Sequence, residues 1–444
     1  MGSTLQSPLT LPCGVSLPNR IAKAAMTEQI AGPDNQAHDG HAALYDQWGR
    51  SGCGLLITGN VQVDPDNLEA PGNVVISGEP STGHRAALRA WSQAARCDGA
   101  HVWMQISHAG RQTPKLINPQ PLSASDVKLA LPGGQFGQPR AMTEAEIRAT
   151  IARFATCAAV ARETGFDGVQ IHAAHGYLIS QFLSPRSNLR TDEWGGTLEN
   201  RARLLLETVR AVRTAVGPVY PVAVKLNSAD FQKGGFRFDE CLQVVDWLGD
   251  AGVDLLEVTG GTYEQPKLLG IDGLEAPEDQ PVRASTRERE AYFVDYAAEV
   301  AARARMPVMA TGGFRSRKAM EEAVDGGLAQ MVGIGAPLCT DPHGVQKLLD
   351  GKTDRLENIS KTLRLGPGWF GPNSSNGMVK VVNALGQQAW NYLAIEALSQ
   401  GAPVPRTLGL FSAYRRHQSR TRDQAKAMQA YRRKQGEPSS PPAA

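Results

Sequence analysis

GVQIHAAHGY, residues 168–177, joins a short apolar run to a polar end, and this combination decides the fold class of the 444-residue chain. The run Gly168 to His172 is apolar almost throughout instead of alternating, as expected of a parallel strand buried on both faces. Before it, Thr143 to Thr164 is predicted to be a helix, because Thr143 and Glu146 form a capping box and apolar residues follow at helical spacing. The stretch therefore belongs to a β/α unit.

Seven further β-rich apolar runs flank this stretch and alternate with helical patterns. The predicted strands are Ile21 to Met26, Gly54 to Thr58, His101 to Ser107, Pro221 to Leu226, Leu255 to Thr259, Pro307 to Thr311 and Gln330 to Gly333. The other predicted helices are Arg85 to Ala95, Leu198 to Ala215, Asp239 to Ala251, Glu288 to Arg305 and Ser316 to Asp325. Eight units of about forty residues predict an α/β fold, a (β/α)8 TIM barrel over residues 1–350. A doubly wound sheet remains the alternative, because spacing does not show closure.

Composition and charge exclude several classes of protein. With 46 Lys and Arg against 44 Asp and Glu, the net charge of +2 argues against a dedicated binder of nucleic acid or another polyanion. Apolar residues make up 41% of the chain, enough for a sizeable core. The six cysteines are scattered singly, and neither a secretory signal nor an apolar run of about 18 residues occurs. We therefore expect a cytoplasmic protein without membrane contact.

The residues beyond 350 have a different pattern. Residues 351–434 are predicted to form a C-terminal helical and basic extension, and 435–444 a disordered tail. Asn376 to Ser399 is predicted to be one amphipathic helix. Its apolar side is expected to contain Met378, Val379, Val382, Leu385, Ala389 and Leu393. Residues 413–434 contain eight Arg or Lys against one Asp, and we expect this segment to be solvated or to meet an acidic partner.

Chemistry belongs at the C-terminal ends of the strands in either architecture. Three loops there are long, residues 109–142, 173–196 and 260–287, and their Gly, Pro and Asn content fits pocket-forming loops. His172, His175 and Tyr177 follow the fourth strand and could together bind an oxygen that gains negative charge and supply a proton beside it. A metal site would need His108 as a third ligand, and structural hydrogen bonds of the two histidines are the other alternative.

Two further groups of residues indicate a bound cofactor. Gly312, Gly313, Gly333 and Gly335 follow the last two strands, where a barrel commonly binds phosphate through backbone N–H groups. Within the strands, two polar side chains are predicted to point inward, namely Gln105 and Lys225. A buried amide and a buried cation need polar partners, which a heteroaromatic ring could provide. The alternative for Lys225 is an internal salt bridge with Glu257 or Asp230.

At this point four motifs resemble the old yellow enzyme family, the FMN-dependent NADH:flavin oxidoreductases and ene reductases of the single-domain type. They are IHAAHGYLISQFLSPRSNLRTDEWGGTLENRARLLLE at 171–207, LPNRIAKAAMT at 17–27, MQISHAGRQ at 104–112 and VKLNSADF at 224–231. The resemblance implies a TIM barrel with FMN at its mouth. It also implies reduction of the flavin by NADH or NADPH, and hydride transfer from flavin N5 to the β-carbon of an activated alkene.

The resemblance also assigns roles to single residues. His172 and His175 would hold the substrate carbonyl oxygen, and Tyr177 would protonate the α-carbon. Gln105 would contact the flavin pyrimidine edge, and Lys225 would lie near N1 and O2. The other residues expected to bind FMN are Ala24, Ala25, Met26, Thr27, Asn60, Gly312, Gly313, Gly333, Gly335 and Ala336. Gln29 would contact the substrate together with the two histidines and the tyrosine, and no resident metal is implied.

Three positions depart from the family pattern. Asn60 replaces a small residue, and Gln29 stands where a subgroup has a substrate-binding Tyr, so both bear on substrate preference. Ala336 stands where an arginine usually binds the FMN phosphate. Losing a charged hydrogen bond costs roughly 1.5–3 kcal/mol, or about ten- to a hundredfold in affinity. We therefore expect weaker FMN binding, which Arg315 could partly offset.

The sequence thus predicts an NAD(P)H-dependent reductase of the C=C bond of α,β-unsaturated carbonyl compounds or nitroalkenes. Without a cysteine set or a GxGxxG after the barrel, nicotinamide and alkene are expected to use one site in ping-pong fashion. Alternatives are a redox-neutral or oxidative flavoenzyme on the same barrel, and a flavin-depleted binding protein. A tRNA dihydrouridine synthase would use a cysteine as proton donor, where this chain has Tyr177. The C-terminal extension could mediate a homodimer.

Overall fold

The computed structural model describes residues 4–129, 131, 134–260, 294–372 and 374–436. The predicted loop 260–287, apart from residue 260, and the start of the predicted helix 288–305 lie outside these residues, as do residues 437–444 of the predicted tail. Among the described helices, none combines the length and hydrophobicity needed to cross a membrane. All six cysteines are free thiols.

Eight parallel strands form one closed barrel in the described part of the chain, which confirms the predicted (β/α)8 fold and excludes an open doubly wound sheet. The barrel strands are β3 (Ile21–Lys23), β4 (Leu55–Gln62), β5 (His101–Ser107), β8 (Gly168–Ala173), β9 (Val222–Asn227), β10 (Leu255–Thr259), β11 (Val308–Thr311) and β12 (Met331–Ile334). Closure is made where β12 pairs with β3. Two strand ends differ from the prediction by more than one residue: β3 stops at Lys23, so residues 24–26 lie in the following loop, and β4 continues to Gln62.

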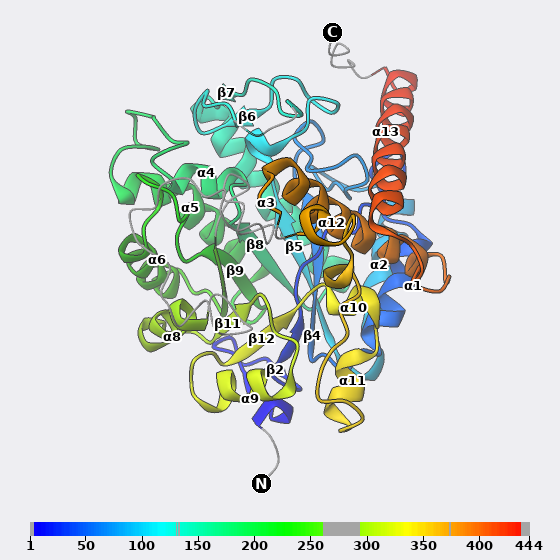
Figure 1. Ribbon diagram of the computed structural model, residues 1–444. Helices are drawn as coiled ribbons and strands as arrows, with labels where there is room; N and C mark the ends of the chain where they lie inside the picture. Colours follow the sequence, from blue (N-terminus) through cyan, green and yellow to red (C-terminus); the bar gives the residue numbers. More distant parts are fainter. Residues whose placement is uncertain (1–3, 130, 132–133, 261–293, 373, 437–444) are drawn as a thin grey trace.

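Helices surround the barrel (Figure 1). They are α1 (Asp39–Gly49), α2 (Thr82–Ala95), α3 (Glu144–Glu163), α4 (Leu178–Leu183), α5 (Leu198–Val216), α6 (Phe238–Asp250), α8 (Val294–Arg303), α9 (Arg317–Asp325), α10 (Pro337–Thr340), α11 (Gly344–Leu349), α12 (Gly377–Ser399) and α13 (Leu410–Lys434). The predicted capping box of α3 is present, since Thr143 Oγ1 accepts from the Glu146 N–H and the Glu146 carboxylate accepts from the Thr143 N–H. The sequence patterns missed α1, which follows the first barrel strand.

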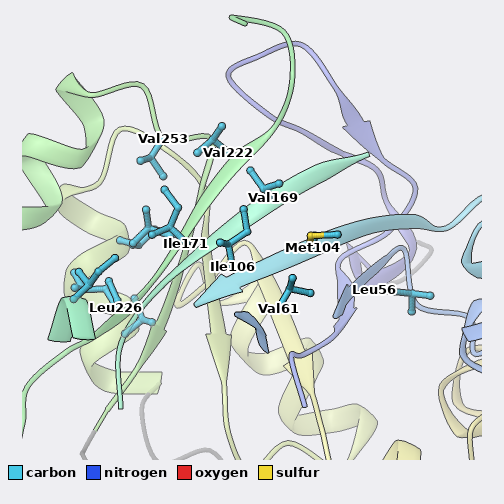
Figure 2. Close-up of a cluster of buried hydrophobic side chains, with 14 of the residues drawn as sticks. Leu56, Val61, Met104, Ile106, Val169, Ile171, Val222, Leu226 and Val253 are labelled. Atoms are coloured by element: carbon cyan, nitrogen blue, oxygen red, sulfur yellow. The ribbon is translucent and has the colours of Figure 1, made fainter. Parts of the chain in front are cut away.

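The strands alternate between two apolar environments. Side chains on the outer surface pack beneath the helices; Figure 2 shows Met104 and Ile106 on β5 and Val169 and Ile171 on β8 among them. The alternate side chains fill the lower barrel interior. They are Ala22, Leu55, Ile57, Trp103, Ala223, Leu255, Met309 and Met331. The hairpin of β1 (Leu9–Thr10) and β2 (Ser16–Leu17) closes this end, because Leu9 and Leu17 pack into the same cluster.

The C-terminal extension packs against the barrel side that carries α1 and α10, and α13 stands at the edge of the molecule (Figure 1). The predicted apolar face of α12 is right only in part, because Ala389 is buried but Met378 is 64% exposed. The buried residues of the helix include Asn383, Gly386, Ala389, Trp390, Ala394, Ile395 and Leu398. Gly386 allows the close approach of α13, since a Cβ there would lie 2.4 Å from Leu410 Cδ2. The division of the chain into a barrel, residues 1–350, and an extension, residues 351–434, stays a prediction.

Candidate active site

A chain of polar side chains crosses the barrel above its apolar floor. Gln105 Nε2 donates to Gln170 Oε1 (2.6 Å), and Gln170 Nε2 donates to Glu257 Oε2 (2.8 Å). Lys225 Nζ lies 2.9 Å from Glu257 Oε1. These four side chains point inward because they take alternate positions on four neighbouring strands, two residues beyond the apolar layer. Lys225 therefore has Glu257, and not Asp230, as its internal partner.

The two histidines and Tyr177 lie together at the end of β8. The ring centroids of His172 and Tyr177 are 4.8 Å apart at an interplanar angle of 85°, and those of His172 and His175 are 5.2 Å apart at 73°. His175 has φ 60° and Gly176 has φ 78°, so two left-handed residues turn the chain sharply between strand and helix. Tyr177 then caps α4. The geometry brings together the three residues that the sequence singled out.

Both imidazoles are neutral at physiological pH. Burial holds the pKa of His172 and of His175 well below the usual value, and the nearby Lys225 charge acts in the same direction. His172 Nδ1 accepts the backbone N–H of Ala174 (3.2 Å), so its proton is on Nε2. His175 Nε2 lies 3.0 Å from Thr259 Oγ1. His172 is therefore a neutral donor, suited to an oxygen that becomes negative.

A second cluster surrounds a carboxylate that sequence reasoning missed. Thr27, in the loop after β3, donates its hydroxyl to both oxygens of Glu69 (2.8 and 2.9 Å), and Asn60 Nδ2 on β4 donates to the same carboxylate. The Tyr177 hydroxyl forms a further side-chain hydrogen bond with Glu69. Burial raises the pKa of Glu69 above its usual value, although the hydrogen bonds from Asn60, Thr27 and Tyr177 lower it.

The predicted glycines meet at the ends of β11 and β12. Thr311 pairs with Gly333 in register, and a Cβ at Gly333 would lie 2.1 Å from Thr311 Oγ1. Gly312 and Gly313 follow with φ of 124° and 89°, a conformation that favours glycine. Ala336 immediately follows these residues and starts α10. This loop pair is a cradle whose backbone can approach an anion closely.

Helix α13 reaches the predicted substrate residue Gln29. His417 Nε2 lies 2.9 Å from Gln29 Oε1, Gln424 Nε2 donates to the Gln29 carbonyl (2.9 Å), and Arg420 donates to the same oxygen. Gln29 has φ 56°, an uncommon conformation held by these contacts. Arg432 also pairs with Asp66 at 3.1 Å. The basic segment is solvated only in part, because Arg420 and Arg432 contact the site loops while its other Arg and Lys side chains are exposed.

His108, the possible third metal ligand, and Asp230, the possible partner of Lys225, make other contacts. His108 Nε2 is 3.6 Å from Asp64 Oδ2, and its Nδ1 accepts the Gly110 N–H (3.0 Å). Asp230 accepts the Phe236 N–H and lies near Asn227. Both therefore serve loops around the barrel mouth.

Comparison with known proteins shows to which family the chain belongs. Residues 4–355 match the NADH:flavin oxidoreductase / NADH oxidase family. The chain belongs to this family. The NADH-dependent flavin oxidoreductase nadA of Aspergillus parasiticus is 39% identical over 352 residues, 76% of each chain. The NADH-dependent flavin oxidoreductase iliE of Hypocrea jecorina is 37% identical over 76% of this chain and 86% of its own length.

Two solved structures share the fold of this flavin oxidoreductase. The old yellow enzyme homologue from Zymomonas mobilis superposes with a TM-score of 0.67 at 24% identity, over 82% of this chain and 97% of its own. Morphinone reductase in complex with tetrahydroNAD gives a TM-score of 0.63 at 25% identity, over 81% of this chain and 93% of its own. The predicted old yellow enzyme relationship is confirmed. The chain is thus an oxidoreductase, with FMN as cofactor and a nicotinamide as reductant.

The side chains of this flavin oxidoreductase fit FMN. Thr27, Asn60, Gln105 and Lys225 bring a hydroxyl, two amides and a cation to one barrel mouth, which suits a ring with carbonyl and nitrogen acceptors. Asn60 Oδ1 is buried and has no hydrogen-bond partner in the described part of the chain. Ala24, Ala25 and Met26 lie in the loop beside Thr27, and Gly335 is close to Met26, whose Sδ is 3.6 Å from an added Cβ. The glycine cradle can receive the phosphate.

Three residues of this flavin oxidoreductase escaped sequence reasoning for different reasons. Gln170 left a signal, since it is the polar residue inside the otherwise apolar run before His172. Glu69 lies in a loop with three other carboxylates between residues 60 and 80, and nothing in the spacing distinguishes it. The contact of His417 with Gln29 joins residues 388 positions apart, and no local pattern predicts it.

Proposed function

We propose that this flavin oxidoreductase reduces the C=C bond of α,β-unsaturated carbonyl compounds and nitroalkenes. The observation that carries the proposal is the grouping of His172, His175 and Tyr177 at the end of β8. A neutral N–H donor and a phenol side by side match the needs of alkene reduction, in which an oxygen gains charge and a carbon gains a proton.

Each side chain has a distinct task in this proposal. Bound FMN, reduced by the nicotinamide, supplies a hydride to the β-carbon. The Nε2–H of His172 donates to the activating oxygen and stabilises its developing charge, with His175 beside it. Tyr177 is 3% exposed and gives its hydroxyl proton to the α-carbon. Gln29, held by α13, limits the space for the substituent on the alkene.

We further propose NADH as the reductant, used at the same site as the alkene in ping-pong fashion. The relatives nadA and iliE are both named NADH-dependent, which supports this choice. Comparing kcat/KM for NADH and NADPH tests it, and initial-rate lines that stay parallel as the alkene concentration is varied would support the ping-pong order.

The decisive experiment measures NADH oxidised and alkene consumed under anaerobic conditions with cyclic enones, maleimides and nitroalkenes. Alkene reduction requires one NADH per alkene. Alkene isomerisation without net NADH use would support a redox-neutral flavoenzyme instead. A purified protein that binds no FMN at any concentration would leave only the binding-protein alternative.

We also propose a homodimer formed through the C-terminal extension, and a cytoplasmic location. Supporting the dimer, four large apolar side chains of the extension are more than half exposed, namely Trp369, Phe370, Met378 and Phe411. Light scattering of the wild type and of Phe411→Glu tests it, and a monomeric wild type would overturn it. The free thiols support a reducing compartment, which cell fractionation can check.

A further inference from the structure

Glu69 contacts the residue that must deliver a proton. Its carboxylate forms a side-chain hydrogen bond with Tyr177 and accepts from Thr27 and Asn60. The neighbouring acid, Glu28, has other hydrogen-bond donors. Its Oε1 accepts from the Tyr45 hydroxyl (2.6 Å) and the Gly59 N–H (2.8 Å). Of these two acids, Glu69 is the one with a hydrogen bond to Tyr177, and Glu28 binds Tyr45 and Gly59.

Tyr177 must regain a proton after each turnover. If its O–H bond breaks as the Cα–H bond forms, the electron pair remains on the phenolate oxygen. Tyr177 is 3% exposed, and its ring neighbour His172 is neutral, so an unpartnered phenolate there is costly. The site needs a nearby acid that can return the proton.

Glu69 has the properties of such an acid. It is partly buried, and burial together with the Glu28 charge favours its protonated form more than in water. Thr27, Asn60 and Tyr177 face it as hydrogen-bond donors, and Glu28 faces it as a charge. Its remaining exposure allows it to recover a proton from solvent.

We propose that Glu69 and Tyr177 form a two-membered proton relay. After Tyr177 has protonated the α-carbon, the Glu69 O–H bond breaks as the phenol O–H bond reforms. The Glu69 carboxylate then takes up one H⁺ from bulk solvent, the proton that the reaction consumes overall. No oxidant or reductant is needed beyond those of the reaction itself. The inference rests on the proposed alkene reduction and adds a positioning and proton-supplying residue to it.

Glu69→Gln is the central variant, because glutamine keeps the shape and one acceptor oxygen but cannot transfer a proton. Stopped-flow kinetics separate the two half-reactions. Flavin reduction by NADH should be unchanged, while reoxidation by an enone over repeated turnovers should slow roughly ten- to a hundredfold. In the wild type this step should slow as pH rises through the pKa of Glu69, and this dependence should disappear in Glu69→Gln. Glu69→Asp should recover part of the rate.

Two comparisons distinguish a relay from a structural role. In a Tyr177→Phe background, Glu69→Gln should cause no further loss, since the relay is already broken. Glu28→Gln is the matched control from the same mouth. It should keep a pH dependence of reoxidation, moved to lower pH because the Glu28 charge no longer raises the pKa of Glu69. The relay would be overturned if the rate losses of Tyr177→Phe and Glu69→Gln were additive. It would also be overturned if Glu69→Gln kept the pH dependence of reoxidation, or if Glu28→Gln lost it.

A measurement without turnover separates failure of the relay from failure of the proposed function. The infrared C=O band of a protonated carboxylic acid should be present in the wild type, absent in Glu69→Gln, and lost as pH rises. If this band is absent at the pH at which the enzyme turns over, the relay is wrong whatever the substrate. If the band behaves as expected but no alkene is reduced, it is the proposed function that fails.

Discussion

Lys225 Nζ lies 2.9 Å from Glu257 Oε1 inside the barrel, and the two side chains are 5% and 0% exposed. Glu257 Oε1 accepts no hydrogen bond of standard geometry within the described residues, so the attraction is mainly electrostatic. Glu257 therefore balances the charge of Lys225, the cation expected beside flavin N1. Its pull on an anionic reduced flavin is weaker than that of a lone cation.

Glu257→Gln should therefore raise the midpoint potential of bound FMN. Removing the negative charge leaves Lys225 free to stabilise the reduced flavin. A change of 1.4 kcal/mol corresponds to about 30 mV for a two-electron couple, and we expect a shift of at least this size. Spectroelectrochemical titration measures it. Lys225→Met should shift the potential downward. If both variants shifted it in the same direction, Glu257 would not act by balancing the charge of Lys225.

Tyr177→Phe should slow alkene reduction roughly 10²- to 10⁴-fold, because the variant retains the ring but has no acid proton. Flavin reduction by NADH should keep its rate, since that step takes no proton from Tyr177. Single-turnover kinetics of the two half-reactions test this prediction, and an unchanged rate with the enone would exclude Tyr177 as the proton donor.

The double variant His172→Ala, His175→Ala should lose binding of a phenol, followed by charge-transfer absorption. In the wild type, burial lowers the pKa of both imidazoles, so both remain neutral as pH rises from 6 to 8. Phenol affinity should then show no change near pH 6.5, the ordinary histidine pKa. A break there would mean that a charged imidazole binds the oxygen.

Ala336→Arg should tighten FMN binding roughly ten- to a hundredfold by adding a charged hydrogen bond to the phosphate. Calorimetric titration of FMN into the apoprotein gives the dissociation constants of both forms. Ala336→Met is the control, because it adds length without charge. Equal affinity of all three proteins would show that another group, such as Arg315, already satisfies the phosphate.

Lys23 should make stability depend on pH. Its Nζ donates to the carbonyls of Ala24 (3.1 Å) and Ile57 (2.7 Å), and burial lowers its pKa to about 8. Between pH 8 and 10.5 the unfolded chain binds more protons than the folded one, so this residue's contribution to stability rises with pH. From pH 7 to pH 10, the free energy of unfolding of the wild type should increase by roughly 2 kcal/mol relative to Lys23→Met. Urea unfolding at both pH values measures it, and a constant difference would contradict the shifted pKa.

Local patterns predicted most of the barrel. The capping box at Thr143 placed the start of α3, and the unbroken apolar run before His172 placed β8, because these signals depend on neighbours along the chain. The face of α12 could not be predicted this way. Its apolar residues occur on several sides, and packing against α13 through Gly386 decided which side is buried.

The sequence by itself determined the barrel, the family and the grouping of His172, His175 and Tyr177, since all three follow one strand and stay within six residues. Only the tertiary structure decided that Glu257 neutralises Lys225, that Glu69 meets Tyr177, and that α13 holds Gln29. Such contacts join residues from different strands and loops. Closure of the barrel brings them within a few ångströms, whatever their distance along the chain.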